Sequence, residues 1–277
     1  MNKTPNVDGL QQIRHIVLDM DGTIYKGIKL FDCTLPFLAY LRETGIGYTF
    51  LTNNTSRSKS DYVHKLAAFG IECDEQQIYT PADSAIVYLR RHHDWARSIA
   101  VLGTPSLSAE FEQAGFRVTW DDPEAVVVGF DTTLTYDRLC RAAWWICQGL
   151  PFIATHPDLV CPTDEPTVLV DCGSICAALT AATGRAPAVL GKPDPSILLD
   201  LCECLGLAPR EIAMVGDRIY TDMAMARAAE AFAVLVLSGE ATAADVPGMQ
   251  TPPDLIVHDI GEFGKLLCMA RNGRSKP

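Results

Sequence analysis

Short apolar runs alternate with amphipathic helical stretches along the chain. Runs that end in polar turns predict buried strands at Ile13–Asp19, Gly47–Thr52, Ile212–Gly216, Ala231–Leu237 and Asp254–Val257. Leu35–Thr44 has apolar residues on one face and is followed by Gly45, which predicts a helix, and Ser58–Phe69 has the same pattern. Strands that alternate with helices predict an α/β fold with a doubly wound parallel sheet covered on both faces.

The middle of the chain repeats this alternation. Further strands are predicted at Ser98–Gly103, Ala125–Phe130 and Pro151–Thr155, with helices between and after them. Tyr79–Pro81 and Gly184–Pro187 are candidate boundaries of this stretch. We therefore predict an inserted α/β domain over residues 83–186, within a discontinuous core formed by residues 1–82 and 187–277.

Composition narrows the classes of partner. The net charge of −11 and the lack of any basic run longer than Arg90–Arg91 argue against nucleic-acid binding. No apolar run approaches the ~20 residues of a membrane span, and Met1–Asn6 lacks the apolar core of a signal peptide. The ten cysteines form no Cys-x-x-Cys pair, as expected for reduced thiols. We expect a cytoplasmic protein with no membrane partner.

Two acidic residues follow the first predicted strand. Asp19 and Asp21 are two positions apart, so in extended backbone their carboxylates point to the same side. A bound divalent cation would keep both ionised, and with oxygen ligands and a phosphate substrate that ion would be Mg²⁺. The alternative is an exposed acidic turn that bends at Gly22.

A polar segment follows the second predicted strand. Thr52 and Asn53 precede a predicted helix, where unpaired N–H groups and the positive end of the helix dipole favour an anion. The alternative is helix capping by Thr55, Ser56 or Ser58.

Two more candidate groups lie nearer the C-terminus. Lys192 precedes a helix start made by Asp194 and Pro195, and it could neutralise carboxylates and a phosphate. The alternative is a surface lysine beside a helix cap. Asp217 ends another predicted strand and would complete a metal site, whereas Asp222 could support that site or stabilise a helix dipole.

The order of these motifs resembles the haloacid dehalogenase (HAD) superfamily. The motifs that carry the resemblance are Asp19-x-Asp21-Gly22-Thr23, Thr52-Asn53-Asn54, Gly191-Lys192-Pro193 and Gly216-Asp217-Arg218-x-x-Thr221-Asp222. The Thr-Asn-Asn element and the large insertion resemble the NagD / 4-nitrophenylphosphatase group. The resemblance covers almost the whole chain and implies a Rossmann-like core with an inserted α/β cap.

The resemblance implies a role for each motif residue. Asp19 would be the nucleophile that forms an aspartyl-phosphate, and Asp21 would be the general acid and then the general base. Thr52 and Asn53 would bind the phosphoryl group, and Lys192 would balance its charge.

The resemblance also implies the cofactor and the substrate class. Mg²⁺ would be bound by the Asp19 carboxylate, the Asp21 backbone carbonyl and Asp217, with Asp222 and Gly22 in support. The expected activity is Mg²⁺-dependent hydrolysis of small phosphate monoesters: sugar phosphates, nucleotides, phosphoglycolate-like compounds or aryl phosphates.

Other activities differ in residues that can be checked in the sequence. Dehalogenases and phosphonatases of this superfamily lack the acid that Asp21 supplies, and its ion pumps carry threonine there and need membrane helices. A dinucleotide-dependent oxidoreductase would need a Gly-x-Gly-x-x-Gly turn, which neither Asp19–Gly22 nor Leu102–Pro105 supplies. A phosphotransferase or phosphomutase with the same intermediate, and a non-catalytic metabolite-binding module, stay open.

The inserted domain is expected to select the substrate. By resemblance, the loops at Thr155–Asp158 and Asp171–Ser174 would recognise the leaving group, with His156 and Asp158 as the candidate residues. Relatives commonly carry asparagine where His156 stands, so this residue either contacts the substrate or forms hydrogen bonds within its loop. Leu159–Pro166 is predicted as a loop, and a homo-oligomer formed through the cap is left open.

Overall fold

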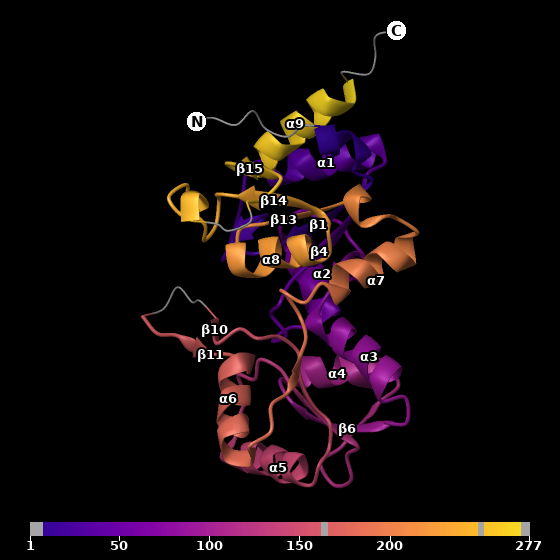
Figure 1. Cartoon of the computed structure of the whole chain (residues 1–277), viewed down its shortest axis with the longest axis vertical. Helices are drawn as coiled ribbons and strands as arrows, with labels where there is room; N and C mark the ends of the chain where they lie inside the picture. Colours follow the sequence, from indigo (N-terminus) through magenta and orange to yellow (C-terminus); the bar gives the residue numbers. More distant parts are fainter. Residues whose placement is uncertain (1–7, 162–165, 249–251, 273–277) are drawn as a thin grey trace. The chain divides into compact units, whose positions relative to one another are not determined.

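The computed structural model describes residues 8–161, 166–248 and 252–272 (Figure 1). The chain divides into two compact units. The core unit combines Met1–Leu51, Leu66–Ile78 and Pro193–Pro277, and the inserted unit combines Thr52–Lys65 and Tyr79–Lys192. The predicted domain limits at residues 83 and 186, and the roles assigned to the two domains, stay predictions.

The core unit is built on a six-stranded sheet. Its strands, in spatial order, are β15 (Leu255–Val257), β14 (Phe232–Val236), β13 (Ile212–Gly216), β1 (His15–Asp19), β4 (Gly47–Leu51) and β5 (Ile78–Tyr79). The strands from β15 to β4 run parallel, and Asp19 is the register partner of Leu51. Every residue of β1, β13 and β14 is buried, as expected for a parallel sheet covered on both faces.

Helices cover both faces of this sheet. Helices α1 (Thr34–Thr44) and α9 (Ile260–Asn272) pack together on one side, and α8 (Ala224–Ala228) lies on the other (Figure 1). The chain winds outward from β1 to β4 and, in the opposite direction, from β13 to β14. The winding direction therefore changes between β1 and β13, and open α/β sheets bind ligands at the carboxyl ends of the strands at such a switch point.

The inserted unit has its own parallel sheet. Its strands, in spatial order, are β12 (Ala188–Val189), β9 (Phe152–Ala154), β8 (Ala125–Val128), β6 (Ser98–Leu102) and β7 (Arg117–Val118). Four helices accompany it: α3 (Pro81–His92), α4 (Pro105–Gln113), α5 (Tyr136–Cys147) and α6 (Cys172–Thr183).

Alternate residues of β6 point into two different apolar cores. Ile99 and Val101 join the core that contains Leu89 of α3 and Phe111 of α4. Ala100 and Leu102 join the second core, which contains residues of α5 and α6. The inserted unit is therefore a three-layer α/β/α structure in which both faces of the sheet are buried.

The remaining elements are short. Two further α-helices are α2 (Lys59–Ala68) and α7 (Ser196–Leu205). Two hairpins are formed by β2 (Tyr25–Lys26) with β3 (Lys29–Leu30) and by β10 (Val160–Cys161) with β11 (Leu169–Val170). No helix among the described residues is long and apolar enough to cross a membrane.

One sequence prediction about local structure is wrong. Leu159–Pro166 was expected to be a loop, but Val160–Cys161 pairs antiparallel with Leu169–Val170. A strand of two residues leaves no alternating pattern to detect, and only its partner strand defines it. Residues 162–165 of that segment lie outside the described residues. The predicted α/β class, with a doubly wound parallel sheet, is confirmed.

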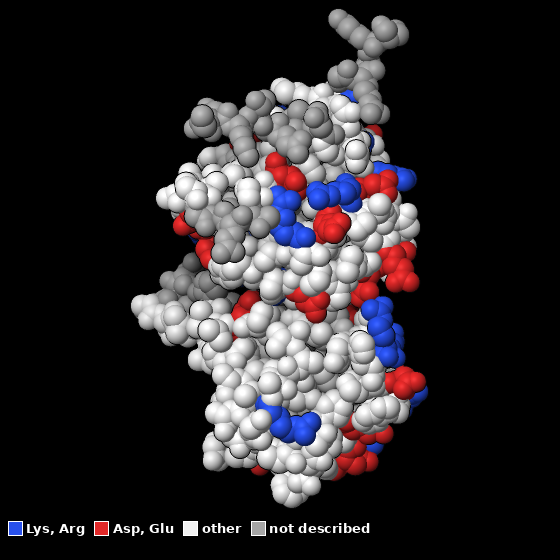
Figure 2. Space-filling model, in the orientation of Figure 1, with Lys and Arg blue, Asp and Glu red and all other residues white. Residues whose placement is uncertain are grey.

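Charged side chains are dispersed over the visible surface. On the face shown in Figure 2, basic and acidic side chains are interspersed and most of the surface is uncharged. The acidic residues of greatest chemical interest are instead buried in the interior of the core unit.

Candidate active site

Three buried carboxylates meet at the switch point of the core sheet. Asp19 is the last residue of β1, Asp217 directly follows β13, and Asp222 lies in the following π-helical turn, Ile219–Met223. One oxygen of each carboxylate lies within 4.8 Å of the others. Their exposed fractions are 8% for Asp19, 3% for Asp217 and 0% for Asp222.

Backbone N–H groups and one hydroxyl donate hydrogen bonds to some oxygens of these three carboxylates. The Asp217 Oδ2 atom accepts the N–H of Glu240 at 2.6 Å, and Asp222 Oδ2 accepts the N–H of Arg218 at 3.1 Å. The Thr23 hydroxyl donates to Asp19 Oδ2 at 3.3 Å. Within the described part of the chain, Asp217 Oδ1 is buried and has no hydrogen-bond partner. A buried oxygen of this kind is suited to a cation.

The electrostatics of the group also favour a cation. Burial, followed by the charges of Asp19 and Asp222, raises the pKa of Asp217 to about 7. Arg218 forms an ion pair with Glu240 at 3.0 Å. Burial opposes the charge of Arg218, but the negative charges around it, of which Asp19 is the largest, together outweigh burial and raise its pKa. Three carboxylates and one guanidinium leave excess negative charge. Oxygen donors with excess negative charge fit a hard divalent cation such as Mg²⁺.

Gly22 is required by the approach of Asp217. Its φ is +91°, and a Cβ atom there would lie 2.2 Å from Asp217 Oδ2. The N–H of Gly22 donates to the Tyr25 carbonyl at 2.7 Å, and the Ser238 hydroxyl donates to the Gly22 carbonyl at 2.7 Å. The turn after β1 is therefore fixed against the carboxylate that β13 delivers.

Asp21 differs from Asp19 in its surroundings. Its side chain is exposed, and its carboxylate is outside the group of three. The metal role predicted for Asp21 uses its backbone carbonyl, so it does not depend on the side chain entering that group. An exposed carboxylate is in keeping with exchange of protons with water.

The predicted phosphate-binding residues lie in the inserted unit. Asn53 Oδ1 accepts the N–H of Lys192 at 2.9 Å, and Asn53 Nδ2 donates to the Lys192 carbonyl at 3.1 Å. These residues are 139 positions apart in the sequence. Thr52, whose hydroxyl accepts the N–H of Asn54 at 3.1 Å, directly follows Leu51, the register partner of Asp19.

The alternative of helix capping is confirmed for Ser58, the residue before α2: its hydroxyl accepts the N–H of Asp61 at 3.1 Å, and the Asp61 carboxylate accepts the N–H of Ser58 at 2.8 Å. Other groups of this segment are held by residues far away in the sequence. The Thr55 hydroxyl accepts the N–H of Phe130 at 2.9 Å, and the N–H of Lys59, the first residue of α2, is accepted by Glu110 at 2.6 Å. Glu110 comes from α4, and no local sequence signal links it to α2.

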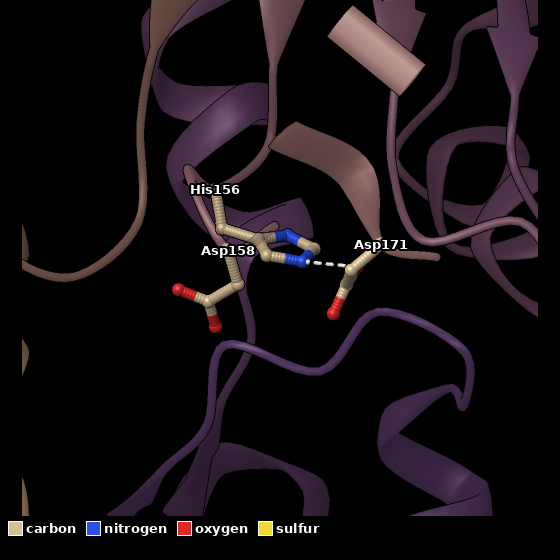
Figure 3. A group of neighbouring side chains, drawn as sticks. All are labelled: His156, Asp158 and Asp171. Carbon is tan, nitrogen blue, oxygen red and sulfur yellow. Dashed lines mark hydrogen bonds and ion pairs between the residues drawn. The ribbon is translucent and has the colours of Figure 1, made fainter. Parts of the chain in front are cut away.

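Figure 3 shows a second group, formed by His156, Asp158 and Asp171. The His156 ring points towards Asp171, with Nε2 2.9 Å from Asp171 Oδ1, and its Nδ1 atom lies 2.9 Å from the Thr155 hydroxyl. The ring is 0% exposed. With both nitrogens bonded to the protein, the geometry favours the second alternative for His156: a hydrogen-bonding role within its loop rather than substrate contact.

Asp158 has a different environment. Its carboxylate is half-buried, points away from the His156 ring, and accepts Asn53 Nδ2 at 3.3 and 3.4 Å (Figure 3). Sequence reasoning identified His156 and Asp158 but did not single out Asp171, Arg218 or Glu240. Asp171 could have been recognised in the sequence as the acid that precedes an apolar helix, and Arg218 as a member of the Gly216–Asp222 motif. No pattern in the sequence indicates that Glu240 lies near this group.

Comparison with known proteins identifies the family. A family model described as haloacid dehalogenase-like hydrolase matches residues 16–117, and a second, HAD-hydrolase-like model matches residues 189–263. An acid sugar phosphatase of Staphylococcus aureus is 31% identical over 254 residues, which cover 91% of this chain and 97% of the relative.

Comparison with solved structures identifies the same family. The crystal structure of a 4-nitrophenylphosphatase from Thermotoga maritima has a TM-score of 0.88 and 39% identity, covering 93% of this chain and 98% of that one. A glycerol phosphate phosphatase from Mycobacterium tuberculosis, in complex with magnesium, has a TM-score of 0.84 and 30% identity, covering 94% of this chain and 78% of that one.

The chain belongs to the HAD-like hydrolases. Within that family it is a phosphatase of the NagD / 4-nitrophenylphosphatase group, as its motifs predicted. The parallel core sheet with added cap-type elements is the architecture shared with these relatives.

We predict that Gly22→Ala disrupts the carboxylate group. Gly149→Ala is the matched control, because its φ is +94° and no atom lies within 4 Å of the added Cβ. The control is expected to lower the free energy of unfolding by about 1–2 kcal/mol through backbone strain. Gly22→Ala adds overlap with Asp217, costing about 1–3 kcal/mol more. Denaturant unfolding and a phosphatase assay measure both effects; equal costs, with activity kept, would contradict the prediction.

Proposed function

We propose that this HAD phosphatase is a Mg²⁺-dependent hydrolase of small phosphate monoesters that forms an aspartyl-phosphate on Asp19. The buried Asp19, Asp217 and Asp222 group, with its unpartnered oxygen on Asp217, is the observation that carries the proposal. The names of the relatives, acid sugar phosphatase and 4-nitrophenylphosphatase, favour sugar phosphates and aryl phosphates among the expected substrates.

In the proposed reaction, Asp19 is the nucleophile and Asp21 is the general acid and then the general base. An oxygen of the Asp19 carboxylate attacks phosphorus, and the bond to the leaving oxygen breaks while Asp21 donates a proton to that oxygen. Asp21 then takes a proton from water as the water oxygen attacks the phosphorus of the aspartyl-phosphate. This second step releases inorganic phosphate and regenerates the Asp19 carboxylate.

The other motif residues handle charge. The Asp19 and Asp217 carboxylates and the Asp21 backbone carbonyl would hold Mg²⁺, with Asp222 in support. When bound, the ion supplies positive charge that offsets carboxylate repulsion and stabilises charge on the transferred oxygens.

Thr52, Asn53 and Lys192 would bind the phosphoryl group. The two hydrogen bonds between Asn53 and the Lys192 backbone support this role, because they fix the start of the lysine side chain. Lys192 is 3% exposed, and it would contribute its charge where water is largely excluded.

The main alternative is transfer of the phosphoryl group to an acceptor other than water. Phosphotransferases and phosphomutases would use the same intermediate on Asp19. Product analysis with added alcohols separates these outcomes: hydrolysis releases phosphate in proportion to substrate consumed, whereas transfer produces a new phosphate ester.

We also propose a cytoplasmic location. The ten cysteines form no Cys-x-x-Cys pair, as is typical of thiols kept reduced in the cytoplasm. Fractionation of cells that express the untagged protein tests this proposal.

Asp19→Asn is predicted to abolish turnover while leaving the fold intact. An amide has nearly the shape of a carboxylate but is a poor nucleophile, so kcat is expected to fall by about 10⁴-fold or more. Steady-state kinetics and circular dichroism test the two parts. Activity within tenfold of the unmodified protein would assign the nucleophile to another residue.

Asp21→Asn is the comparison variant for this test. It removes the general acid but keeps the nucleophile, so alkyl phosphates are expected to lose about 10²–10⁴-fold. The loss for 4-nitrophenyl phosphate is expected to be smaller in the first step, because nitrophenolate leaves readily without a proton. Equal losses in single-turnover release of both leaving groups would remove the acid role of Asp21.

Asp217→Ala is predicted to weaken Mg²⁺ binding and turnover together. At about 100 times its Kd, Mg²⁺ is expected to stabilise the unmodified protein by about 2.7 kcal/mol, and Asp217→Ala should lose most of that gain. The control Asp245→Ala removes an exposed carboxylate of the same unit, which is hydrogen-bonded to Thr242. This control should be stabilised by Mg²⁺ as much as the unmodified protein. Thermal unfolding with EDTA and then Mg²⁺ measures the effect. Full activity after exhaustive chelation would remove the metal from the mechanism.

Asp158→Asn is predicted to change substrate preference. Asparagine can still accept the Asn53 amide, so the substitution removes charge and leaves the contact possible. The Asp158 charge should disfavour monoesters with an anionic leaving group, such as phosphoglycolate. Their kcat/KM relative to that of a neutral sugar phosphate is expected to rise about tenfold or more. An unchanged order of preference would remove Asp158 from substrate recognition.

A further inference from the structure

The phosphoryl-transfer chemistry leaves one buried ion pair unexplained, the pair between His156 and Asp171 in the inserted unit. We propose that these two residues are positioning residues for phosphate binding: they fix the loop 155–158 and, through Asp158 and Asn53, the backbone of Lys192. The proposal rests on the proposed function, because it is there that Asn53 and Lys192 bind the phosphoryl group.

The loop is attached firmly to the start of α6. The N–H of Gly173 donates to the Asp158 carbonyl at 2.8 Å, and the N–H of Asp171 donates to the Leu159 carbonyl at 3.0 Å. A Cβ atom on Gly173 would lie 2.2 Å from the Pro157 carbonyl oxygen, so only glycine permits this approach. Asp171 Oδ1 accepts both the N–H of Cys172 at 2.6 Å and His156 Nε2 at 2.9 Å. One carboxylate therefore caps the helix and holds the histidine.

From the loop, contacts continue to Lys192. The Asp158 carboxylate accepts the Asn53 amide, and Asn53 bonds both the N–H and the carbonyl of Lys192. The loop also packs on the residue before the lysine, since a Cβ atom on Gly191 would lie 2.9 Å from the His156 Cβ atom. A shift of His156 thus reaches Lys192 by two routes within the same unit.

The surroundings of the ring favour its charged form. Burial alone would lower the pKa of His156, but Cys172, the hydrogen bond to Asp171 and the charges of Asp171 and Asp158 outweigh burial and raise the pKa to about 9. The other charged residue next to this segment is Lys192, directly after Gly191.

A protonated ring also gives every proton an acceptor. Nε2–H donates to Asp171 and Nδ1–H to the Thr155 hydroxyl. The Thr155 hydroxyl then donates to Cys172 Sγ at 3.8 Å. Each proton of the charged ring therefore has an acceptor within the protein.

The same group has the spacing of a metal site, because the ligand atoms of His156, Asp158 and Asp171 lie within 4.8 Å of one another. A metal ion would need a lone pair on a ring nitrogen, and both nitrogens are engaged with protein atoms. The geometry therefore points to an ion pair rather than to metal binding.

A positioning role has a kinetic signature that substrate contact lacks. All phosphate monoesters share the phosphoryl group, so displacement of Asn53 and Lys192 should slow hydrolysis of 4-nitrophenyl phosphate and of a sugar phosphate by the same factor. Direct recognition of a leaving group would slow only the sugar phosphate.

The test replaces Asp171 by asparagine. Asp171→Asn keeps an oxygen that can cap α6 and accept from His156, but removes the charge that stabilises the imidazolium. In the unmodified protein, proton NMR should show His156 titrating above pH 8, with the resonance assigned from the spectrum of His156→Gln. In Asp171→Asn its pKa should fall by at least one unit.

Activity should follow the same titration. With Asp171→Asn the ring loses its proton at lower pH, so the alkaline fall in kcat/KM should move to lower pH. At pH 8, kcat/KM for both substrates should fall by about 10- to 100-fold. His156→Gln should lower activity equally for both substrates and show no pH shift of this kind.

Asp259→Asn is the matched control. Asp259 also accepts an N–H at the start of a helix, from Glu262 at 2.9 Å, and its carboxylate lies 3.2 Å from His258 Nδ1. The His258 side chain is 81% accessible, Asp259 is partly buried, and both belong to the core unit. The control should keep the activity and pH profile of the unmodified protein.

Several results would overturn the proposal. A His156 that titrates below pH 7 in the unmodified protein would remove the ion pair, and this measurement needs no variant. Loss of activity towards the sugar phosphate alone would indicate direct recognition, and stoichiometric Zn²⁺ binding lost in Asp171→Asn would indicate a metal site. Asp19→Asn separates the two proposals: if it stays active the proposed mechanism fails, whereas the NMR titration still reports on the pair.

Discussion

Mutual repulsion among three buried carboxylates is the constraint on which the core unit depends. Asp19, Asp217 and Asp222 are held within 4.8 Å of one another where solvent cannot screen them. The fold compensates with backbone N–H donors from Glu240 and Arg218 and with the Arg218 guanidinium. The unpartnered Asp217 oxygen shows that this compensation is incomplete. In the proposed function, a bound cation offsets the remaining repulsion and stabilises the charge that moves in phosphoryl transfer.

The surrounding backbone is shaped by the same constraint. Gly22 and Gly239 have no side chains where Asp217 lies, and Gly216 leaves room for Asp222. The turn after β1 is thus fitted to a carboxylate that comes from a strand about two hundred positions later in the chain. Regular secondary structure brings the strand ends together, and the small residues between them set how closely the carboxylates approach.

In the inserted unit, the main structural requirement is that the backbone of Lys192 is held in place. Lys192 follows a short segment rather than a helix or a long strand, so its backbone needs other support. Asn53 supplies that support with two hydrogen bonds, and the loop at 155–158 supports Asn53 in turn. Because His156 is buried and bonded on both ring nitrogens, its contribution is to order this loop. In the proposed function, binding of the phosphoryl group therefore depends on residues that never touch the substrate.

The α/β class, the main strands and helices, and the family could be predicted from the amino-acid sequence. The alternation of short apolar runs with amphipathic stretches, and the four motifs, can be read from the order of residues along the chain. The sequence also identified Asp19, Asp217 and Asp222 as candidates, since they lie at the end of a predicted strand or in the segment after it, and a parallel sheet brings these strand ends to one edge. It could not find the short strand at Val160–Cys161 or the part played by Asp171. It also could not choose between substrate contact and internal hydrogen bonding for His156. Those outcomes depend on partners far away in the chain, and burial, hydrogen bonding and charge at a residue are decided only when the tertiary structure brings such partners together.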